Sequence, residues 1–236
     1  PEEQITTYLP ELTQTGWKGA KLRHALDMTS GVRYVEDYEA LDSDMASTDV
    51  ASGWRPAKPD VPYFQCIWDQ ILSLNEVVRE HGGVFEYRSI ETEVLAHCME
   101  RVTQTPLAEL ISQELWQPLG VEESACFTVD GAGYPLADGG FNATLRDYAR
   151  FGEMLCNDGT ANGQQIVPKA WIADSLNADP SIFSDTNNMD LDNGAYRNQF
   201  WIRDVDRRIL IARGVFGQIV YADLDNRVTI ARLASW

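Results

Sequence analysis

Tyr87 and Ser89 occupy a position in the chain at which side chains can gain reactivity. The run from Val84 to Tyr87 is β-like, and Ser89 is a natural N-cap for a helix through about residue 102. A side chain held just before a helix N-terminus experiences the positive end of the helix dipole, which favours a phenolate or a bound anion. An ordinary half-buried tyrosine fits the same residues, so both interpretations stay open.

Two further segments have residue types suited to a site. The stretch from Gly214 to Gln218 lies between two strand-like runs, and glycine in such a pattern indicates either a closely approaching ligand or a bulge. The acidic loop that runs from Glu36 through Tyr38 to Asp49 either supplies polar contacts to a substrate or is a solvated face.

The cysteines and histidines do not form a metal-binding pattern. Cys66, Cys98, Cys126 and Cys156 include no Cys-x-x-Cys pair, and the three histidines include no His-Glu-x-x-His. We therefore expect no metal and no other cofactor. Cys98 and Cys156 fall in apolar helical patterns, so we expect both thiols to be buried.

The charge balance argues against two classes of partner. A formal net charge of −17 repels nucleic-acid phosphates and anionic lipid, and no apolar run is long enough to span a bilayer. We expect no nucleic-acid or membrane partner. The acidic surface either suits neutral or cationic substrates or is simply a solvated face. The chain opens on Pro1 without a signal peptide, so the sequence does not choose between a cytoplasmic and a periplasmic location.

The spacing of apolar residues predicts the helices that must position these side chains. We expect helices near 22–31, over 64–79 and 89–102, from about 105 to 118, over 144–157 and from about 168. Thr144 with Asp147 resembles a capping box. No period is sustained from Val32 to Pro62, and a loop of that length is usually functional or mobile.

The end of the chain changes to the period of strands. Runs rich in β-branched and aromatic residues are separated by Asp, Asn and Arg turns, at residues 198–204, 208–215, 218–223 and 227–235. This pattern indicates an antiparallel meander. Helices in the middle followed by a meander predict an α+β fold, with helices packed on an antiparallel sheet.

Taken in chain order, these segments resemble the serine β-lactamase-like superfamily, of the class C and family VIII carboxylesterase type. That superfamily has a Ser-x-x-Lys serine, a Tyr-x-Asn or Tyr-x-Ser tyrosine and a strand motif of the Lys-Thr-Gly kind. The match is strongest to 6-aminohexanoate-dimer (nylon-oligomer) hydrolases. It rests on these collinear motifs, in addition to Tyr87-x-Ser89: Leu26–Gly31, Glu36-Asp37-Tyr38, Asp49, Gly53-Trp54-Arg55, Asp138-Gly139-Gly140, Gly217-Gln218 and Leu233–Trp236.

The resemblance implies a β-lactamase/transpeptidase-like fold in a single domain over residues 1–236. A mainly helical lobe is expected over roughly 32–175, with antiparallel strands over roughly 198–235. The implied activity is that of a serine hydrolase, which cleaves a linear amide or ester through an acyl-enzyme. The implied partner is therefore a small-molecule amide or ester, and homodimer formation is left open.

The resemblance also implies roles for residues. Tyr87 would relay a proton to the leaving group, its pKa lowered by a lysine cation, and Ser89 would hydrogen-bond that lysine. Tyr38 and Asp49 match substrate-facing loop positions, where a carboxylate would receive a substrate ammonium. The segment Phe216-Gly217-Gln218-Ile219 would lend a backbone N–H to the oxyanion hole.

The sequence departs from the family pattern at the nucleophile. No lysine has a serine three residues before it, because Lys18, Lys21, Lys58 and Lys169 follow Thr15, Lys18, Arg55 and Ile166. In the family the Ser-x-x-Lys helix precedes the position at which this chain starts. We therefore expect both chain ends to be truncated, and this fragment alone to be inactive.

Two departures in the strand motif bear on the substrate. Phe216 stands where Lys or His is usual, and Ile219 stands where the nylon-oligomer enzymes have Asn. Phenylalanine cannot form an ion pair with a β-lactam carboxylate, which favours an esterase or amidase. A β-lactamase or D,D-peptidase, and a catalytically silent relative that binds a ligand or partner, are the alternatives.

Overall fold

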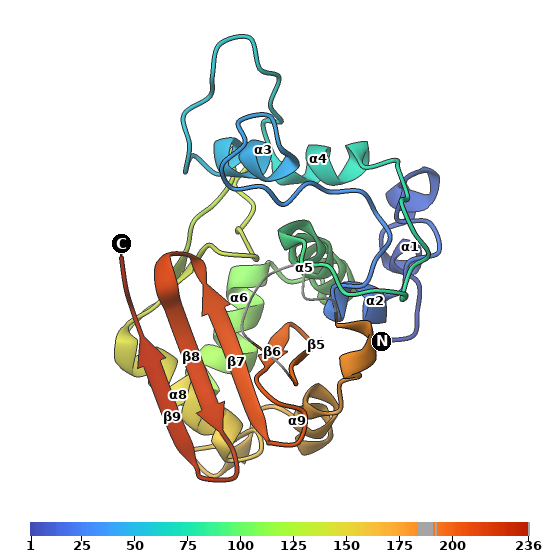
Figure 1. Ribbon diagram of the computed structural model, residues 1–236. Helices are drawn as coiled ribbons and strands as arrows, with labels where there is room; N and C mark the ends of the chain where they lie inside the picture. Colours follow the sequence, from blue (N-terminus) through green and yellow to red (C-terminus); the bar gives the residue numbers. More distant parts are fainter. Residues whose placement is uncertain (184–190, 192, 236) are drawn as a thin grey trace. The chain divides into compact units, whose positions relative to one another are not determined.

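Helices make up most of the regular structure in the first of the chain's two units, which comprises residues 1–107 and 127–141. The computed structural model describes residues 1–183, 191 and 193–235 (Figure 1). The elements of this unit are α1 (Ile5–Tyr8), the 3₁₀ turn η1 (Pro10–Gln14), α2 (Leu22–Leu26), α3 (Asp44–Ala51), α4 (Ile67–Ser73) and α5 (Ser89–Thr103). The longest of them, α5, packs against α1, α2 and α4.

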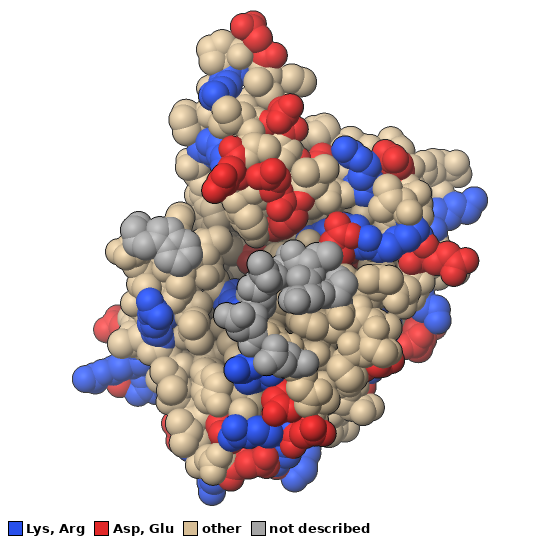
Figure 2. All heavy atoms as spheres, viewed as in Figure 1, with Lys and Arg blue, Asp and Glu red and all other residues tan. Residues whose placement is uncertain are grey.

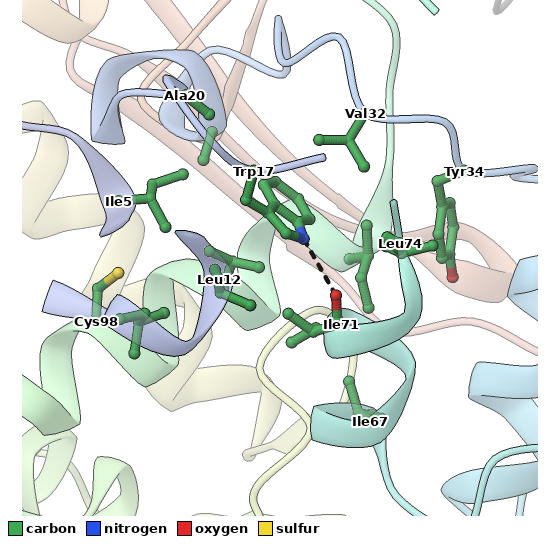
Figure 3. Close-up of a cluster of buried hydrophobic side chains, with 14 of the residues drawn as sticks. Ile5, Leu12, Trp17, Ala20, Val32, Tyr34, Ile67, Ile71, Leu74 and Cys98 are labelled. Atoms are coloured by element: carbon green, nitrogen blue, oxygen red, sulfur yellow. Dashed lines mark hydrogen bonds between the residues drawn. The ribbon is translucent and has the colours of Figure 1, made fainter. Parts of the chain in front are cut away.

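Trp17 anchors the hydrophobic core of the first unit. Its ring is fully buried, and its indole Nε1 donates a hydrogen bond of 3.3 Å to the carbonyl oxygen of Ile71 in α4 (Figure 3). Ile5 and Leu12 are fully buried in the same cluster. Burying one such large apolar side chain contributes about 1.5–3 kcal/mol. The short segment between η1 and α2, which the sequence presents as a glycine-rich break, therefore carries a central core residue.

The helix predicted over 64–79 is shorter than expected. α4 ends at Ser73, and Val77 forms an isolated antiparallel bridge with Val32 instead of continuing the helix. Gly31, expected to end the first predicted helix, instead lies next to this bridge, where the two extended segments approach closely. A Cβ on Gly31 would lie 1.8 Å from a backbone carbonyl oxygen of the facing segment, so only glycine fits there.

The stretch predicted to lack periodicity contains α3, which was not predicted. Ser43 caps this helix, because its hydroxyl oxygen accepts a hydrogen bond of 2.9 Å from the Ala46 N–H. The buried residues of α3 are mostly small or hydroxylated, so they leave no strong apolar stripe in the sequence. α3 carries Asp49, one of the predicted site residues.

The second unit comprises residues 108–126 and 142–236. Its helical elements are the π-helical turn η2 (Ser112–Trp116), α7 (Gln117–Leu119), α8 (Leu145–Cys156), α9 (Lys169–Leu176) and the 3₁₀ turn η3 (Pro180–Ile182), while α6 (Leu107–Ile111) begins at the boundary. Its two-residue strands β3 (Thr160–Ala161) and β4 (Gln164–Gln165) pair with each other. The strands β1 (Cys126–Phe127) and β2 (Phe141–Asn142) lie where the chain passes from one unit to the other.

A five-stranded antiparallel sheet ends the second unit, and its strands follow one another in chain order (Figure 1). They are β5 (Ala195–Arg197), β6 (Phe200–Ile202), β7 (Ile209–Gly214), β8 (Gln218–Asp223) and β9 (Val228–Arg232). The predicted meander is confirmed, and β5 is added to it. A Cβ on Gly152 of α8 would lie 2.4 Å from the Thr229 methyl group of β9, so this glycine permits α8 to pack closely on the sheet.

The start of α8 confirms the predicted cap. The Thr144 hydroxyl oxygen accepts a hydrogen bond from the Asp147 N–H, as the sequence spacing indicates. The expected burial of Cys98 and Cys156 is also confirmed. Helices combined with an antiparallel sheet make the predicted α+β class correct.

Candidate active site

Tyr87 immediately precedes the N-terminus of α5 in the first unit. Arg88 is the N-cap residue, one position earlier than the Ser89 cap that the sequence predicts, and Ser89 is the first helical residue. Burial raises the pKa of the Tyr87 phenol well above its usual range, and the negative charges of Glu36 and Asp138 raise it further. The described residues therefore hold Tyr87 as a protonated phenol, which is opposite to the phenolate that the helix dipole alone favours.

Glu36 explains why the helix dipole does not produce a phenolate. Its Oε2 accepts the Ser89 N–H at 2.9 Å, and its Oε1 accepts the Ser89 hydroxyl, so a carboxylate already covers the N-terminus of α5. Oε1 also accepts the Tyr38 hydroxyl at 2.6 Å. One carboxylate thus joins Tyr38, from the loop before α3, to the serine of the Tyr-x-Ser motif.

The structure brings Tyr38, Tyr87 and Ser89 together around Glu36. Burial is the largest cause that raises the phenol pKa of both tyrosines, and the Glu36 charge raises both further. Glu36 itself was quoted in the motif but was not predicted as a site residue. The available signal was an acidic residue beside an aromatic one in a long loop, which is also typical of a solvated surface.

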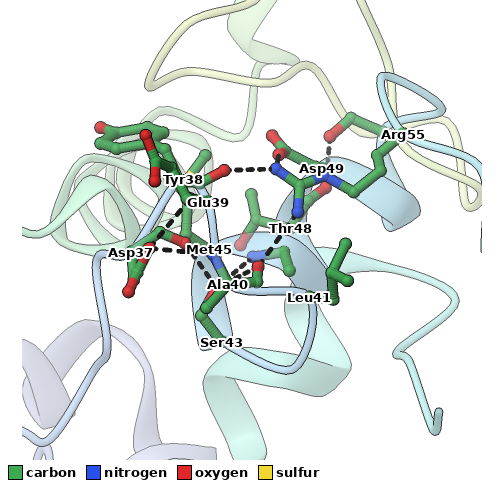
Figure 4. Close-up of polar contacts among 12 residues, drawn as sticks. Asp37, Tyr38, Glu39, Ala40, Leu41, Ser43, Met45, Thr48, Asp49 and Arg55 are labelled. Atoms are coloured by element: carbon green, nitrogen blue, oxygen red, sulfur yellow. Dashed lines mark hydrogen bonds and ion pairs between the residues drawn. The ribbon is translucent and has the colours of Figure 1, made fainter.

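Asp49 lies in α3 and forms an ion pair with Arg55 at 3.0 Å (Figure 4). The same guanidinium donates hydrogen bonds to the carbonyl oxygens of Tyr38 at 2.6 Å and Ala40 at 3.1 Å. Arg55 therefore clamps the Tyr38 loop to α3 through Asp49. Partial burial raises the pKa of Asp49, although Arg55 opposes this shift. A substrate ammonium at Asp49 would have to share the carboxylate with Arg55.

Asp138, whose charge acts on Tyr87, is hydrogen-bonded to a second carboxyl group, that of Glu93. The Asp138 N–H donates a hydrogen bond of 2.9 Å to Glu93 Oε1, and burial raises the pKa of both carboxyl groups. The buried Oδ1 of Asp138 has no hydrogen-bond partner among the described residues. Gly140 fixes the adjacent turn, because a Cβ there would lie 2.6 Å from the Leu136 carbonyl oxygen. When Asp138 is ionised, its charge raises the pKa of Tyr87, as the charge of Glu36 does.

The acidic character of the site region extends to the surface. Asp and Glu side chains gather on the face shown in Figure 2, over α3 and the loop before it. This distribution agrees with the net charge of −17. Among the described residues no group of His, Cys, Asp and Glu side chains has an arrangement suited to a metal ion.

The remaining predicted residues, Phe216 to Ile219, belong to the second unit. Phe216 and Gly217 form the turn between β7 and β8, with left-handed backbone angles φ of 59° and 85°. The side-chain amide of Gln218 bonds to the backbone of Ala234 as both donor and acceptor. Ile219 lies within β8 and pairs with Arg213 of β7. These positions make the segment a tight, ordered hairpin turn, and its oxyanion role stays a prediction.

The second unit also contains a cavity of about 710 Å³, whose lining includes none of the predicted site residues. Arg150 and Arg208 line it, but each is ion-paired, with Asp147 at 3.0 Å and with Asp158 at 2.7 Å respectively. We assign no chemistry to this cavity. In the described part of the chain, no helix has both the length and the apolar character needed to cross a membrane.

A tyrosine and a serine at the start of a long helix, with an antiparallel hairpin sheet later in the chain, are the arrangement that the Tyr-x-Ser and strand motifs indicated. The family model for Beta-lactamase matches residues 1–236, so the chain belongs to this family. The predicted β-lactamase/transpeptidase-like fold is thereby confirmed.

Two relatives place the chain more closely within the family. It is 31% identical over 239 residues to the 6-aminohexanoate-dimer hydrolase of Paenarthrobacter ureafaciens, covering 100% of this chain and 60% of the relative. A solved structure from Bacillus anthracis, proposed to be a 6-aminohexanoate-dimer hydrolase, is 30% identical with a TM-score of 0.87. That match covers 99% of this chain and 60% of the other. The chain thus spans about three fifths of the length of both relatives.

A more distant solved structure shares the fold alone. It is EstCE1, described as a hydrolase with promiscuous acyltransferase activity, and it matches with a TM-score of 0.70 at 16% identity. The match covers 99% of this chain and 72% of that protein. The architecture described above is therefore that of a family whose relatives include hydrolases.

Proposed function

We propose that the full-length protein containing this chain is a serine hydrolase that cleaves a linear amide or ester through an acyl-enzyme. The observation that carries the proposal is the position of Tyr87. It is held as a phenol beside Ser89 at the start of α5, where it can donate a proton to a leaving group. The likeness to two relatives named for hydrolysis of an amide dimer supports the same choice of substrate class.

In the proposed reaction a serine oxygen attacks the substrate carbonyl carbon and forms a carbon–oxygen bond. The serine proton passes by way of Tyr87 to the leaving nitrogen or oxygen, whose bond to the carbonyl carbon breaks. Water then hydrolyses the acyl-enzyme. Backbone N–H groups near Gly217 are proposed to stabilise the developing oxyanion. This chain has no Ser-x-x-Lys, so the reaction depends on a nucleophile that these residues do not include.

Labelling and substrate choice test the proposal directly. We expect the full-length protein to gain the mass of one fluorophosphonate probe and to hydrolyse a p-nitrophenyl ester faster than a chromogenic cephalosporin. Faster cephalosporin hydrolysis would instead support a β-lactamase or D,D-peptidase. The sequence argues against this alternative, because Phe216 stands where a cation is usual. No adduct and no hydrolysis would support a catalytically silent binding relative.

Asp49 is proposed to bind a substrate ammonium. In the full-length protein, Asp49→Asn is expected to lower kcat/KM by about 10- to 100-fold for an amine-bearing substrate, as expected for one lost hydrogen bond to a charged group. A neutral ester of the same length should be hydrolysed nearly as before.

Arg55→Gln is the matched variant for this prediction, because it breaks the clamp on the Tyr38 loop but keeps the Asp49 carboxylate. We expect Arg55→Gln to slow hydrolysis of the neutral ester through the loosened loop, and to slow hydrolysis of the amine-bearing substrate no more than that, because it frees the Asp49 carboxylate. If Asp49→Asn also reduced both substrates by one factor, Asp49 would act only by holding Arg55, and its role in binding an ammonium would be rejected.

A further inference from the structure

Glu36 has the hydrogen-bonding geometry of a residue that organises others. It accepts from two side-chain hydroxyls, those of Tyr38 and Ser89, and from one backbone N–H at the start of a 15-residue helix. All three partners are donors in this arrangement, so a carboxylate satisfies all of them at once. An amide at the same position would present N–H groups to at least one donor and leave it unpaired.

The charges around this cluster come from three segments. The loop before α3 supplies Glu36, α5 is preceded by Arg88, and the segment before β2 supplies Asp138. Arg88 lowers the pKa of Glu36, but burial dominates and raises it. Of the two carboxyl groups that raise the pKa of Tyr87 by their charge, Glu36 has the larger effect.

We propose that Glu36 is a positioning residue, which holds Tyr38 and Ser89 in place beside Tyr87 and sets the electrostatic environment of its phenol. This inference rests on the proposed function, because it assigns Tyr87 a proton-transfer role. On this proposal the loop before α3, which carries Tyr38, also influences Tyr87. Tyr38 is 47% exposed, yet its hydroxyl is tied to the serine of the catalytic motif through Glu36. Movement of the loop would therefore change the environment of Tyr87.

The test compares Glu36→Gln with Glu39→Gln in the full-length protein. Glu39 lies in the same loop with an exposed side chain, so its substitution removes an equal charge without breaking the three hydrogen bonds. With Glu36→Gln, we expect the limb of the kcat/KM pH profile that reports Tyr87 to move to lower pH by about one unit, because a neighbouring negative charge is lost. Glu39→Gln should leave that limb in place.

A readout independent of turnover separates the two proposals. In protein labelled with 3-fluorotyrosine, the fluorine NMR signal of Tyr87 is assigned by its disappearance in Tyr87→Phe, and its midpoint of titration is then measured. A lower midpoint in Glu36→Gln supports the role of Glu36 even if the protein hydrolyses no ester or amide, which would reject only the proposed function. An unchanged midpoint in a folded Glu36→Gln protein overturns the inference, whatever the activity.

Glu36→Asp covers the case in which Glu36→Gln does not fold. Aspartate keeps the charge but withdraws the carboxylate by one methylene, so it loosens the hydrogen bonds to Tyr38 and Ser89. We expect kcat to fall by about tenfold, with the Tyr87 midpoint close to that of the parent protein. A wild-type kcat in Glu36→Asp would show that Glu36 does not position these side chains.

Discussion

Tyr87→Phe in the full-length protein is expected to lower kcat about a hundred- to ten-thousand-fold, the range typical of losing a positioned acid–base group. The substitution removes one hydroxyl and keeps the ring, so packing before α5 should change little. Ester and amide hydrolysis should both fall, but the amide more, because an amine leaves only with a proton. The measurement is steady-state kinetics on a matched ester and amide pair.

Tyr134→Phe is the matched control for this prediction. Tyr134 belongs to the same unit, is 42% exposed and packs edge-on against His97, a contact that phenylalanine keeps. We expect its kcat to equal that of the parent protein. If Tyr87→Phe reduced kcat by less than about tenfold, the phenol would not transfer the proton, and Tyr87 would be removed from the mechanism.

Local patterns in the sequence were sufficient to predict the elements that the site uses most. β8 occupies residues 218–223, as predicted, because alternating residues bounded by turn signals specify a short strand. α5 was predicted within one residue at each end, since a capped, amphipathic segment encodes its own limits. Tyr87 and Ser89 could be placed for the same reason, because their position relative to α5 is a local property.

Tertiary contacts account for what the sequence did not reveal. Glu36 meets Ser89 across 53 residues of sequence, and nothing periodic in its own loop indicates this contact. α3 was missed because small residues fill its buried face. Nothing in the residues next to Trp17 indicates its burial, although it lies in a core formed by segments far apart in the chain. In each case the deciding interaction lies outside any short window of sequence.

The same reasoning explains why the ionisation of Tyr87 differs from what the helix dipole alone favours. A helix N-terminus favours negative charge, but it can be satisfied by any nearby carboxylate. Glu36 takes that place, and burial then favours the neutral phenol. A lysine cation beside Tyr87, as the family resemblance implies, would act against both effects. The pH range over which Tyr87 loses its phenol proton in the full-length protein is therefore expected to depend on the balance between that cation and Glu36.

Arg88→Met is expected to lower the free energy of unfolding by about 1–3 kcal/mol at neutral pH, the range for leaving a buried hydrogen-bonding group unsatisfied. Arg88 is 1% exposed, and it donates a hydrogen bond of 2.8 Å to the Ser30 carbonyl oxygen and pairs with Glu86 at 2.9 Å and with Glu91 at 3.6 Å. Methionine fills similar space but leaves the Ser30 carbonyl oxygen and the Glu91 carboxyl group buried without this donor. Glu86 is 40% exposed and keeps its ion pair with Arg79. Arg101→Met is the control, since its pair with Glu11 is about 40% exposed on both sides and is expected to contribute no more than about 1 kcal/mol.

The loss of free energy of unfolding in Arg88→Met should also become larger as the pH rises. Burial raises the pKa of Glu91 to about 8, and Arg88 lowers it from a still higher value. Removing Arg88 therefore raises the folded-state pKa further, while the unfolded-state pKa stays the same. Below pH 8 Glu91 is mostly protonated in both folded proteins, so its ionisation adds little to the difference in their free energies of unfolding. Above pH 8 Glu91 ionises easily only in the folded parent protein, so the difference in free energy of unfolding increases. Denaturant unfolding at pH 6 and pH 9 measures the change. A gap that narrowed towards pH 9 would show that Arg88 does not stabilise the Glu91 carboxylate.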